Sequence, residues 1–370
     1  VAWFKDLHRP LLRMGADVFK TDFGEDVPAG AVFHDGRTGA TVHNLYPLLY
    51  NRAVAEVTQE ERGYGLVWSR SGTAGSQRFP VCWSGDPAAD WDSLAATIRG
   101  GLNIGLSGVP FWSNDIGGYR GKPAPDLYVR WAQFGLLCSH SRMHGDSPRE
   151  PWIFGDDVLE IVRKYIRLRY KLYPYFFSLA HEASKTGLPV LRAMPLAFPA
   201  DPCAHGLDHQ YMIGPWLLAA PIFNPEGRRS IYLPEGPWFD FWTGRRIDGP
   251  RAMDIKAPLA RMPLFVRAGA ILPTMKPALR IPEGRIDPLI VEVWPHPPVG
   301  PIHGRVLRER IPRPCLGPLP LPLTPVAASK FCFYEDEGRT DFRLSWDGRR
   351  AVLKWKGKRG KDSVRVRFKS

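Results

Sequence analysis

Apolar residues followed abruptly by charged residues mark the start of the chain. The run 16–19 predicts a short buried strand, and Lys20, Asp22 and Glu25 crowd charge into the turn that follows it. Charge at the rim of an apolar layer needs a partner, so we interpret this turn as a ligand site rather than as a plain surface turn.

Two further strands are predicted before residue 120, and each runs into a polar loop. The strand at 64–68 is followed by small polar residues over 69–78, and the strand at 102–109 is followed by the acidic, glycine-rich segment 111–119. A polar loop therefore follows a predicted strand three times.

Helices are predicted between these strands. Apolar residues at helical spacing indicate a helix over 43–61 and a second helix from Trp91 that ends at Gly100-Gly101. Strands and helices that alternate in this way are typical of a parallel β/α architecture, and a (β/α)8 barrel places such loops around its active site. A doubly wound sheet is the alternative, but no Gly-x-Gly-x-x-Gly follows a strand.

Beyond residue 150 the pattern changes from helical to β-rich. One long helix, or two joined near Pro174, is predicted over 156–183. Short runs separated by proline and glycine then predict small antiparallel β domains. The strands are expected at 216–223, 230–233, 264–272, 289–294, 331–334 and 364–368. The predicted fold class is α/β, the C-terminal part of a (β/α)8 barrel followed by small antiparallel β-sandwich domains.

This pattern divides the chain into three predicted domains. They are a partial (β/α)8 barrel over 1–189, a proximal C-terminal β domain over 190–273 and a distal C-terminal β domain over 274–370. The distal domain contains a proline-rich insert at 297–325, which we interpret either as a linker or as a stretch translated from the wrong frame. Peptides from this insert in the native protein would contradict a frame error.

Composition and charge narrow the classes of partner. The 370 residues are 44% hydrophobic and 12% aromatic, which favours packed globular domains over disorder. The net charge of +13 comes from dispersed basic residues without a recognition motif, so no nucleic-acid partner is expected. No apolar run approaches the length of a membrane span, so no membrane partner is expected either.

The cysteines predict a reducing environment. They are odd in number, widely separated and without a Cys-x-x-Cys or His-Cys cluster, so neither zinc nor a disulfide framework is indicated. We therefore expect a cytoplasmic location, with a signal peptide left open because the chain opens on Val1 rather than Met. The five are Cys82, Cys138, Cys203, Cys315 and Cys332.

Asp22 and Asp86 are candidates for acid, base or nucleophilic chemistry. Two loop carboxylates suit glycosidic bond cleavage, because the leaving oxygen needs an acid and the positive anomeric carbon needs an anionic partner. Two unrelated surface aspartates are the alternative. A second polar cluster, at 139–145, holds two histidines and an arginine, and a core role and a site role stay equally open for its histidines.

Four motifs, in this order, extend the argument from single residues to a family. They are Lys20-Thr-Asp-Phe-Gly-Glu25; Arg70 with Gly75-Ser-Gln-Arg-Phe-Pro80 and Trp83-Ser-Gly-Asp86; Phe111-Trp-Ser-Asn-Asp-Ile-Gly-Gly118; and Phe134-Gly-Leu-Leu-Cys-Ser-His-Ser-Arg-Met-His-Gly145. Together they resemble glycoside hydrolase family 31, most of all its bacterial α-xylosidase branch. The resemblance covers most of residues 1 to 275.

The resemblance implies roles for eight residues. Asp22 matches the nucleophile that forms a covalent glycosyl-enzyme, and Asp86 matches the acid that becomes a base for water. Phe23 is expected to stack on the sugar face. The other matching positions that line the sugar subsite are Lys20, Arg70, Trp83, Asp115 and His144.

The chemistry of these residues agrees with the implied roles. Lys20 and Arg70 would keep Asp22 ionised, whereas Asp86 must hold a proton, which requires a less polar setting such as Trp83 provides. Asn114 stands where many relatives carry His, a departure that affects the local hydrogen bonding of the subsite. Sulfoquinovosidases share Asp-Phe-Gly-Glu, but no dedicated sulfonate motif is found here.

The leading interpretation is a retaining, exo-acting α-glycoside hydrolase, an α-xylosidase, acting by double displacement with two aspartates. The alternatives are an α-glucosidase of the same family and a non-catalytic carbohydrate-binding remnant. The expected partner is an α-linked oligosaccharide or small glycoside; no cofactor or metal is expected, and a homo-oligomer is left open. Because the family's nucleophile follows the fourth barrel strand, we also expect a fragment that is inactive alone. Turnover of an aryl α-xyloside by the purified 370-residue chain would contradict that last expectation.

Overall fold

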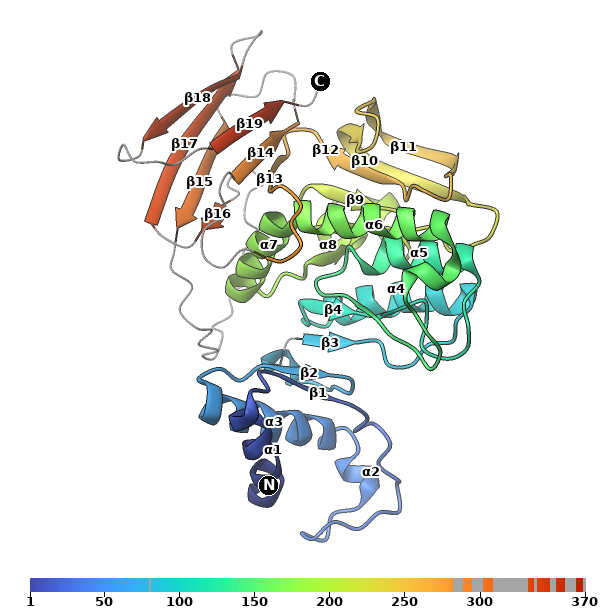
Figure 1. The fold of residues 1–370 in the computed structure, drawn as a ribbon, viewed down its shortest axis with the longest axis vertical. Helices are drawn as coiled ribbons and strands as arrows, with labels where there is room; N and C mark the ends of the chain where they lie inside the picture. Colours follow the sequence, from blue (N-terminus) through green and yellow to red (C-terminus); the bar gives the residue numbers. More distant parts are fainter. Residues whose placement is uncertain are drawn as a thin grey trace.

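The architecture was analysed in a computed structural model of the chain (Figure 1). The structure describes residues 1–79, 81–281 and 289–294, and then five strands of the distal region, of which only the backbone is considered. The predicted insert at 297–325 lies outside the described residues except for one strand, Ile302–Arg308. The predicted domain boundaries stay a prediction.

A four-stranded parallel sheet forms the first half of the chain. Its strand order is β1-β2-β3-β4. All three adjacent pairs run parallel, so the carboxyl ends of the four strands lie at the same edge of the sheet. Helix α3 connects β1 to β2 and helix α4 connects β3 to β4 (Figure 1), the expected β/α alternation. The elements are β1 (Phe19–Thr21), α3 (Tyr46–Arg62), β2 (Val67–Ser69), β3 (Val81–Trp83), α4 (Trp91–Leu106) and β4 (Phe111–Ser113).

Three details of this half differ from the prediction. The first strand lies at Phe19–Thr21 rather than at 16–19, and Val18 is exposed. Strand β3 was not predicted, because three residues are too few to establish a period of two. The segment predicted as a strand at 102–109 is mostly the last turn of α4, and the strand itself comes later, at β4.

Helix α4 continues through Gly100-Gly101, where the sequence predicted its end. Gly101 is buried, and a Cβ atom there would lie 2.4 Å from the ring of Trp112 on β4. Gly101 therefore makes room for the tryptophan instead of ending the helix. Packing of the helix against β4 outweighs the low helix propensity of two glycines.

Alanine at these two glycines is expected to have opposite effects on stability. Gly101→Ala should lower the free energy of unfolding by about 1–3 kcal/mol, because the added methyl group overlaps the Trp112 ring. Gly100→Ala, where no atom lies within 4 Å of the added Cβ, should raise it by about 0.5–1 kcal/mol. Urea unfolding of both variants measures the difference, and equal effects would contradict the packing described here.

The helices after β4 form the centre of the core. The predicted helix over 156–183 is two helices, α6 and α7, that meet just before Pro174. In Figure 1, α5 and α6 lie between the parallel strands and the following sheet. The bounds are α5 (Pro125–Gly135), α6 (Asp156–Lys171) and α7 (Tyr173–Thr186), and the shorter helices are α1 (Ala2–Met14), α2 (Gly39–Val42) and α8 (Met194–Ala197).

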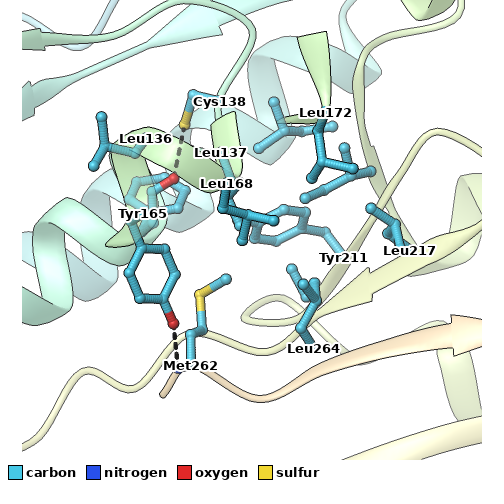
Figure 2. Packing of buried hydrophobic residues seen from close by; sticks show 14 of the residues in the cluster. Leu136, Leu137, Cys138, Tyr165, Leu168, Leu172, Tyr211, Leu217, Met262 and Leu264 are labelled. Atoms are coloured by element: carbon cyan, nitrogen blue, oxygen red, sulfur yellow. Dashed lines mark hydrogen bonds between the residues drawn. The ribbon is translucent and has the colours of Figure 1, made fainter. Parts of the chain in front are cut away.

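One hydrophobic cluster joins these helices to the antiparallel part of the chain. Figure 2 shows Leu168 of α6 packed with Tyr211, Leu217 and Leu264, which come from three different strands. The backbone amide of Met262 donates a 2.7 Å hydrogen bond to the buried hydroxyl of Tyr165. Burial of this many large apolar side chains stabilises the contact between the two regions.

A six-stranded antiparallel sheet follows, in the order β11-β10-β12-β9-β8-β7. The fold class predicted from the sequence is thus confirmed: an α/β barrel region precedes antiparallel sheets. The strands are β7 (Leu191–Ala193), β8 (Tyr211–Ile213), β9 (Leu217–Ala219), β10 (Arg228–Asp240), β11 (Arg246–Lys256) and β12 (Leu264–Arg267).

Two small mixed sheets end the described part of the chain. Within them β14 pairs with β19, and β15 with β16, in parallel, so these sheets are not purely antiparallel as predicted. No helix in the described ranges is long and apolar enough to cross a membrane. The strands are β13 (Ile271–Thr274), β14 (Leu289–Val293), β15 (Ile302–Arg308), β16 (Cys332–Glu335), β17 (Gly338–Trp346), β18 (Ala351–Lys356) and β19 (Val364–Phe368).

Candidate active site

The parallel ladder brings the first predicted site residues together. Lys20 and Thr21 of β1 are register partners of Trp68 and Ser69 of β2, and the backbone amide of Arg70 donates to the carbonyl of Thr21. Since carboxyl ends of parallel strands meet at one edge, residues just past β1, β2 and β3 face a common place.

One guanidinium nitrogen contacts both predicted catalytic carboxylates. Nη1 of Arg70 lies 3.2 Å from Oδ1 of Asp22 and 2.9 Å from Oδ2 of Asp86. Nε of the same side chain lies 2.7 Å from Oε1 of Glu25. Three carboxylates from two loops therefore surround a single, largely buried cation.

Asp22 is held in its ionised form. Its Oδ2 accepts a 3.0 Å hydrogen bond from Lys20, and its Oδ1 accepts from the backbone amide of Phe23 and from Arg70. Partial burial alone would raise the pKa of Asp22, but these donors outweigh it, so that the pKa lies below its usual value. A carboxylate that stays ionised and faces outward is suited to act as a nucleophile.

Removing the Lys20 donor should raise the pKa of Asp22. Lys20→Met keeps an unbranched side chain but loses both the hydrogen bond and the positive charge that favour the carboxylate. Carbon NMR titration of the Asp22 carboxyl measures the shift. Lys5→Met, which removes a lysine paired with Glu56 and Glu60 instead, is the control and should leave the Asp22 titration unchanged.

The backbone at Phe23 is strained where it serves Asp22. Phe23 has a φ of 58°, in the left-handed region that non-glycine residues rarely adopt, and its amide points at the Asp22 carboxylate. Its ring is 57% exposed and lies 4.8 Å from the Arg70 guanidinium carbon. The ring is therefore free to contact a ligand.

Asp86 and Trp83 differ from the sequence-based expectation. Asp86 lies against the Arg70 guanidinium, a polar and charged setting, rather than in the apolar one predicted for it. Trp83 is only 2% exposed, and its ring carries the Lys20 ammonium 3.8 Å from its centroid. In this structure Trp83 supports a charged neighbour of Asp22 instead of lining an open surface.

The last two predicted residues belong to a second, two-stranded pair: Asp115 lies on strand β5 (Asp115–Ile116), and His144 directly follows strand β6 (Arg142–Met143). Asp115 is completely buried, and burial raises its pKa, although the ion pair with Arg142 acts in the opposite direction. His144 is exposed, its ring centroid is 5.4 Å from that of Tyr119, and burial of the nitrogen and the charge of Arg142 lower its pKa. The other histidine of this cluster, His140, is half-buried: its Nδ1 lies 3.0 Å from Oγ of Ser139, and burial lowers its pKa to about 3.

Two arginines were given no role from the sequence. Arg142 was seen only as part of the cluster at 139–145, but it binds Asp115 and contacts two tryptophans. Arg149 is buried and donates to the carbonyl oxygens of Gly118, Tyr119 and Gly121. These bonds hold the loop at 118–121 against the loop that carries Arg149. The sequence does not indicate which arginine will be buried against backbone carbonyls, because these contacts form only in the fold. The nearby glycines were the one feature of the sequence that pointed to a tight loop.

The site contains the groups needed for chemistry that uses two carboxylates, one as a nucleophile and one as an acid or base. Two aspartates share one arginine, a lysine and a backbone amide stabilise one of them, and the exposed ring of Phe23 lies next to that arginine. Within the described residues, no group of three or more His, Cys, Asp or Glu side chains is placed to hold a metal ion.

Comparison with known families gives two consecutive matches. Residues 1–179 match the model of the glycosyl hydrolases family 31 TIM-barrel domain, and residues 187–272 match that of the glycosyl hydrolase family 31 C-terminal domain. Together the two matches cover most of the chain, including every predicted site residue.

Curated relatives are similar over about three quarters of the chain. An α-xylosidase of Emericella nidulans is 39% identical over 297 residues, which cover 76% of this chain and 38% of that protein. An α-xylosidase of Saccharolobus solfataricus is 37% identical over 304 residues, which cover 80% of this chain and 41% of that protein. The chain thus spans about two fifths of these relatives' length. Other matching proteins are named α-glucosidases or glucan 1,3-α-glucosidases.

A solved structure has the same fold. The GH31 dextranase of Flavobacterium johnsoniae, in complex with isomaltotriose, superposes with a TM-score of 0.79 at 29% identity. The superposition covers 93% of this chain and 43% of the dextranase.

Proposed function

The chain belongs to glycosyl hydrolase family 31, and on that premise we propose that the protein is a retaining, exo-acting α-glycoside hydrolase that acts on α-xylosides. The observation that carries the proposal is the shared contact of Asp22 and Asp86 with one nitrogen of Arg70, at 3.2 and 2.9 Å. A close pair of carboxylates is the arrangement that glycoside hydrolysis with retention uses.

Double displacement follows from the different surroundings of the two aspartates. An oxygen of Asp22, kept ionised, attacks the anomeric carbon while Asp86 gives its proton to the leaving oxygen, which forms a glycosyl ester on Asp22. Asp86 then takes a proton from water, and the water oxygen displaces Asp22 from the anomeric carbon. Two inversions restore the original α configuration.

The spacing of the carboxylates supports retention. Because one nitrogen contacts both aspartates, their facing oxygens are closer than the ~6.5 Å lower end of the carboxylate separations in inverting enzymes. Retaining enzymes hold the two carboxyl groups about 5–5.5 Å apart, which leaves no room for a water between the nucleophile and the sugar.

Arg70 contacts both aspartates, so its position has to change when a substrate binds between them. Its Nη1 atom contacts both carboxylates, so a substrate oxygen can approach Asp86 only when the guanidinium interacts mainly with Asp22 and Glu25. We propose that a sugar entering between the aspartates produces this change, because its glycosidic oxygen takes the place of Arg70 next to Asp86.

Xylosides are favoured over glucosides as substrates by similarity. The Lys20-Thr-Asp-Phe-Gly-Glu25 motif has the α-xylosidase form, and the two relatives described above carry that name. An α-glucosidase is the second candidate, because several matching proteins are named so.

A substrate comparison tests the proposal on the protein at its full natural length. We expect kcat/KM for p-nitrophenyl α-D-xyloside to exceed that for the α-D-glucoside at least about tenfold, since an extra hydroxymethyl group in a fitted pocket costs roughly 1–3 kcal/mol. Proton NMR should detect α-xylose as the first product. A preference for the glucoside favours the second candidate, β-xylose as first product contradicts retention, and sugar binding without turnover indicates a non-catalytic remnant.

A further inference from the structure

Both carboxylate oxygens of Asp115 are engaged by a single guanidinium. Its Oδ1 accepts a 2.5 Å hydrogen bond from Nε of Arg142, and its Oδ2 accepts a 2.9 Å bond from Nη2 of the same guanidinium. The two residues are register partners in the parallel pair of β5 (Asp115–Ile116) and β6 (Arg142–Met143), so the backbone fixes them opposite each other. The side chain of Asp115 is completely buried, whereas that of Arg142 stays partly exposed.

The guanidinium of Arg142 continues the contact toward the catalytic loop. Its central carbon lies 4.6 Å from the ring centroid of Trp83 and 4.9 Å from that of Trp68. The Trp83 ring also carries the Lys20 ammonium at 3.8 Å, and that ammonium is 3.0 Å from Asp22. Contacts therefore run without a gap from Asp115 through Arg142, Trp83 and Lys20 to Asp22.

We infer that Asp115 is a positioning residue that acts through Arg142 and does not bind the sugar itself. The bidentate Asp115–Arg142 pair, called the fork below, fixes Trp83 and thereby the Lys20–Asp22 pair. The inference rests on the proposed function, because it assigns Asp115 a role in that reaction. It also revises the role that resemblance implied for Asp115, which was a direct contact with the sugar.

The chemistry of the fork explains why these residue types are used. A bidentate arginine–carboxylate pair fixes the plane of the guanidinium, and a planar cation lies flat on an indole ring as a lysine cannot. Removing only one partner would leave an unpaired buried charge, whereas removing both charges together would not. The two aromatic contacts of Arg142 should therefore be lost when Asp115 is neutralised.

A double-mutant cycle distinguishes positioning through Arg142 from direct sugar binding. In the protein at its full natural length, Asp115→Asn and Arg142→Gln are each expected to lower kcat/KM for p-nitrophenyl α-D-xyloside by about 30-fold or more. The kcat/KM of the double variant should lie within about threefold of that of the less active single variant, because the second change removes no further interaction. Arg142→Lys, which keeps the charge but not the fork, should not rescue activity. Losses that multiply in the double variant would overturn the inference.

Near-UV circular dichroism provides a readout that needs no turnover. Asp115→Asn and Arg142→Gln should change the same tryptophan bands, which Trp68→Phe and Trp83→Phe assign. Bands that change with Arg142→Gln but not with Asp115→Asn would overturn the inference. If the wild type hydrolyses no α-glycoside, the proposed function fails, and this spectrum still decides whether Asp115 acts through Arg142.

Two controls separate positioning from loss of stability. Glu182→Gln breaks another partly buried pair, with Arg192, and should lower the melting temperature while leaving kcat/KM and the tryptophan bands unchanged. If neither single variant folds, the double Asp115→Asn/Arg142→Gln variant carries the test. It must then show altered tryptophan bands and a loss of kcat of about 30-fold or more; an unchanged kcat would overturn the inference.

Discussion

Replacement of Asp22 by alanine is expected to lower kcat for p-nitrophenyl α-D-xyloside by at least about 10⁴-fold, which corresponds to ~5 kcal/mol of barrier. The change removes the oxygen that forms the bond to the anomeric carbon, while Lys20 and Arg70 keep their positions around an empty space. Stopped-flow or long-time steady-state assays of released nitrophenol measure the loss.

Azide and a matched aspartate provide the controls for this variant. Azide fits the space left by the carboxylate and attacks the same face of the sugar, so it should restore turnover and give a xylosyl azide of inverted configuration. Asp35→Ala removes an exposed aspartate that pairs with nearby Arg37 and should retain full activity. Undiminished activity of Asp22→Ala would show that another group is the nucleophile.

Asp86→Ala is expected to have a large effect that depends on the leaving group. Loss of a general acid costs about 10²–10⁴ in rate, and the loss is greatest when the leaving oxygen is strongly basic. An alkyl α-xyloside should therefore lose close to 10⁴-fold, whereas formation of the glycosyl-enzyme from p-nitrophenyl α-xyloside should lose about tenfold or less.

The dependence on the leaving group is measured as the slope of log kcat/KM against the pKa of the departing alcohol. The slope should be steeper in Asp86→Ala than in wild type, and azide should speed the hydrolysis of activated substrates because it needs no base. Glu25→Gln, which changes the third carboxylate on Arg70, is the comparison and should leave the slope unchanged. Equal losses for all leaving groups in Asp86→Ala would contradict its role as the acid.

The part of the site that follows β1 and β2 was predictable from the sequence, and Asp86 was expected on a nearby loop although the strand β3 before it was not predicted. Charged residues directly after short apolar runs predicted one common edge, and the structure brings Lys20, Asp22, Arg70 and Asp86 together there. The reason is physical: a parallel ladder fixes which end of each strand shares an edge, even where the strand limits are displaced by several residues.

What the sequence left unpredicted depends on contacts between distant residues. A three-residue strand such as β3 has no period to detect, and the Gly100-Gly101 pair ends a helix only when nothing packs on it; here the Trp112 ring does. The Asp115–Arg142 fork joins residues 27 positions apart through strands of two residues each, so no local pattern announces it. The charged setting of Asp86 likewise depends on the orientation of Arg70.

Trapping the glycosyl-enzyme tests the central claim most directly. The protein at its full natural length is incubated with a 5-fluoro-xylosyl fluoride, which forms the covalent ester faster than the ester is hydrolysed, and the peptic peptides are mapped by mass spectrometry. The account predicts one fluoroxylosyl group per molecule, attached to the carboxylate of Asp22. A label on Asp86 or Glu25, or inactivation without any covalent sugar, would contradict it.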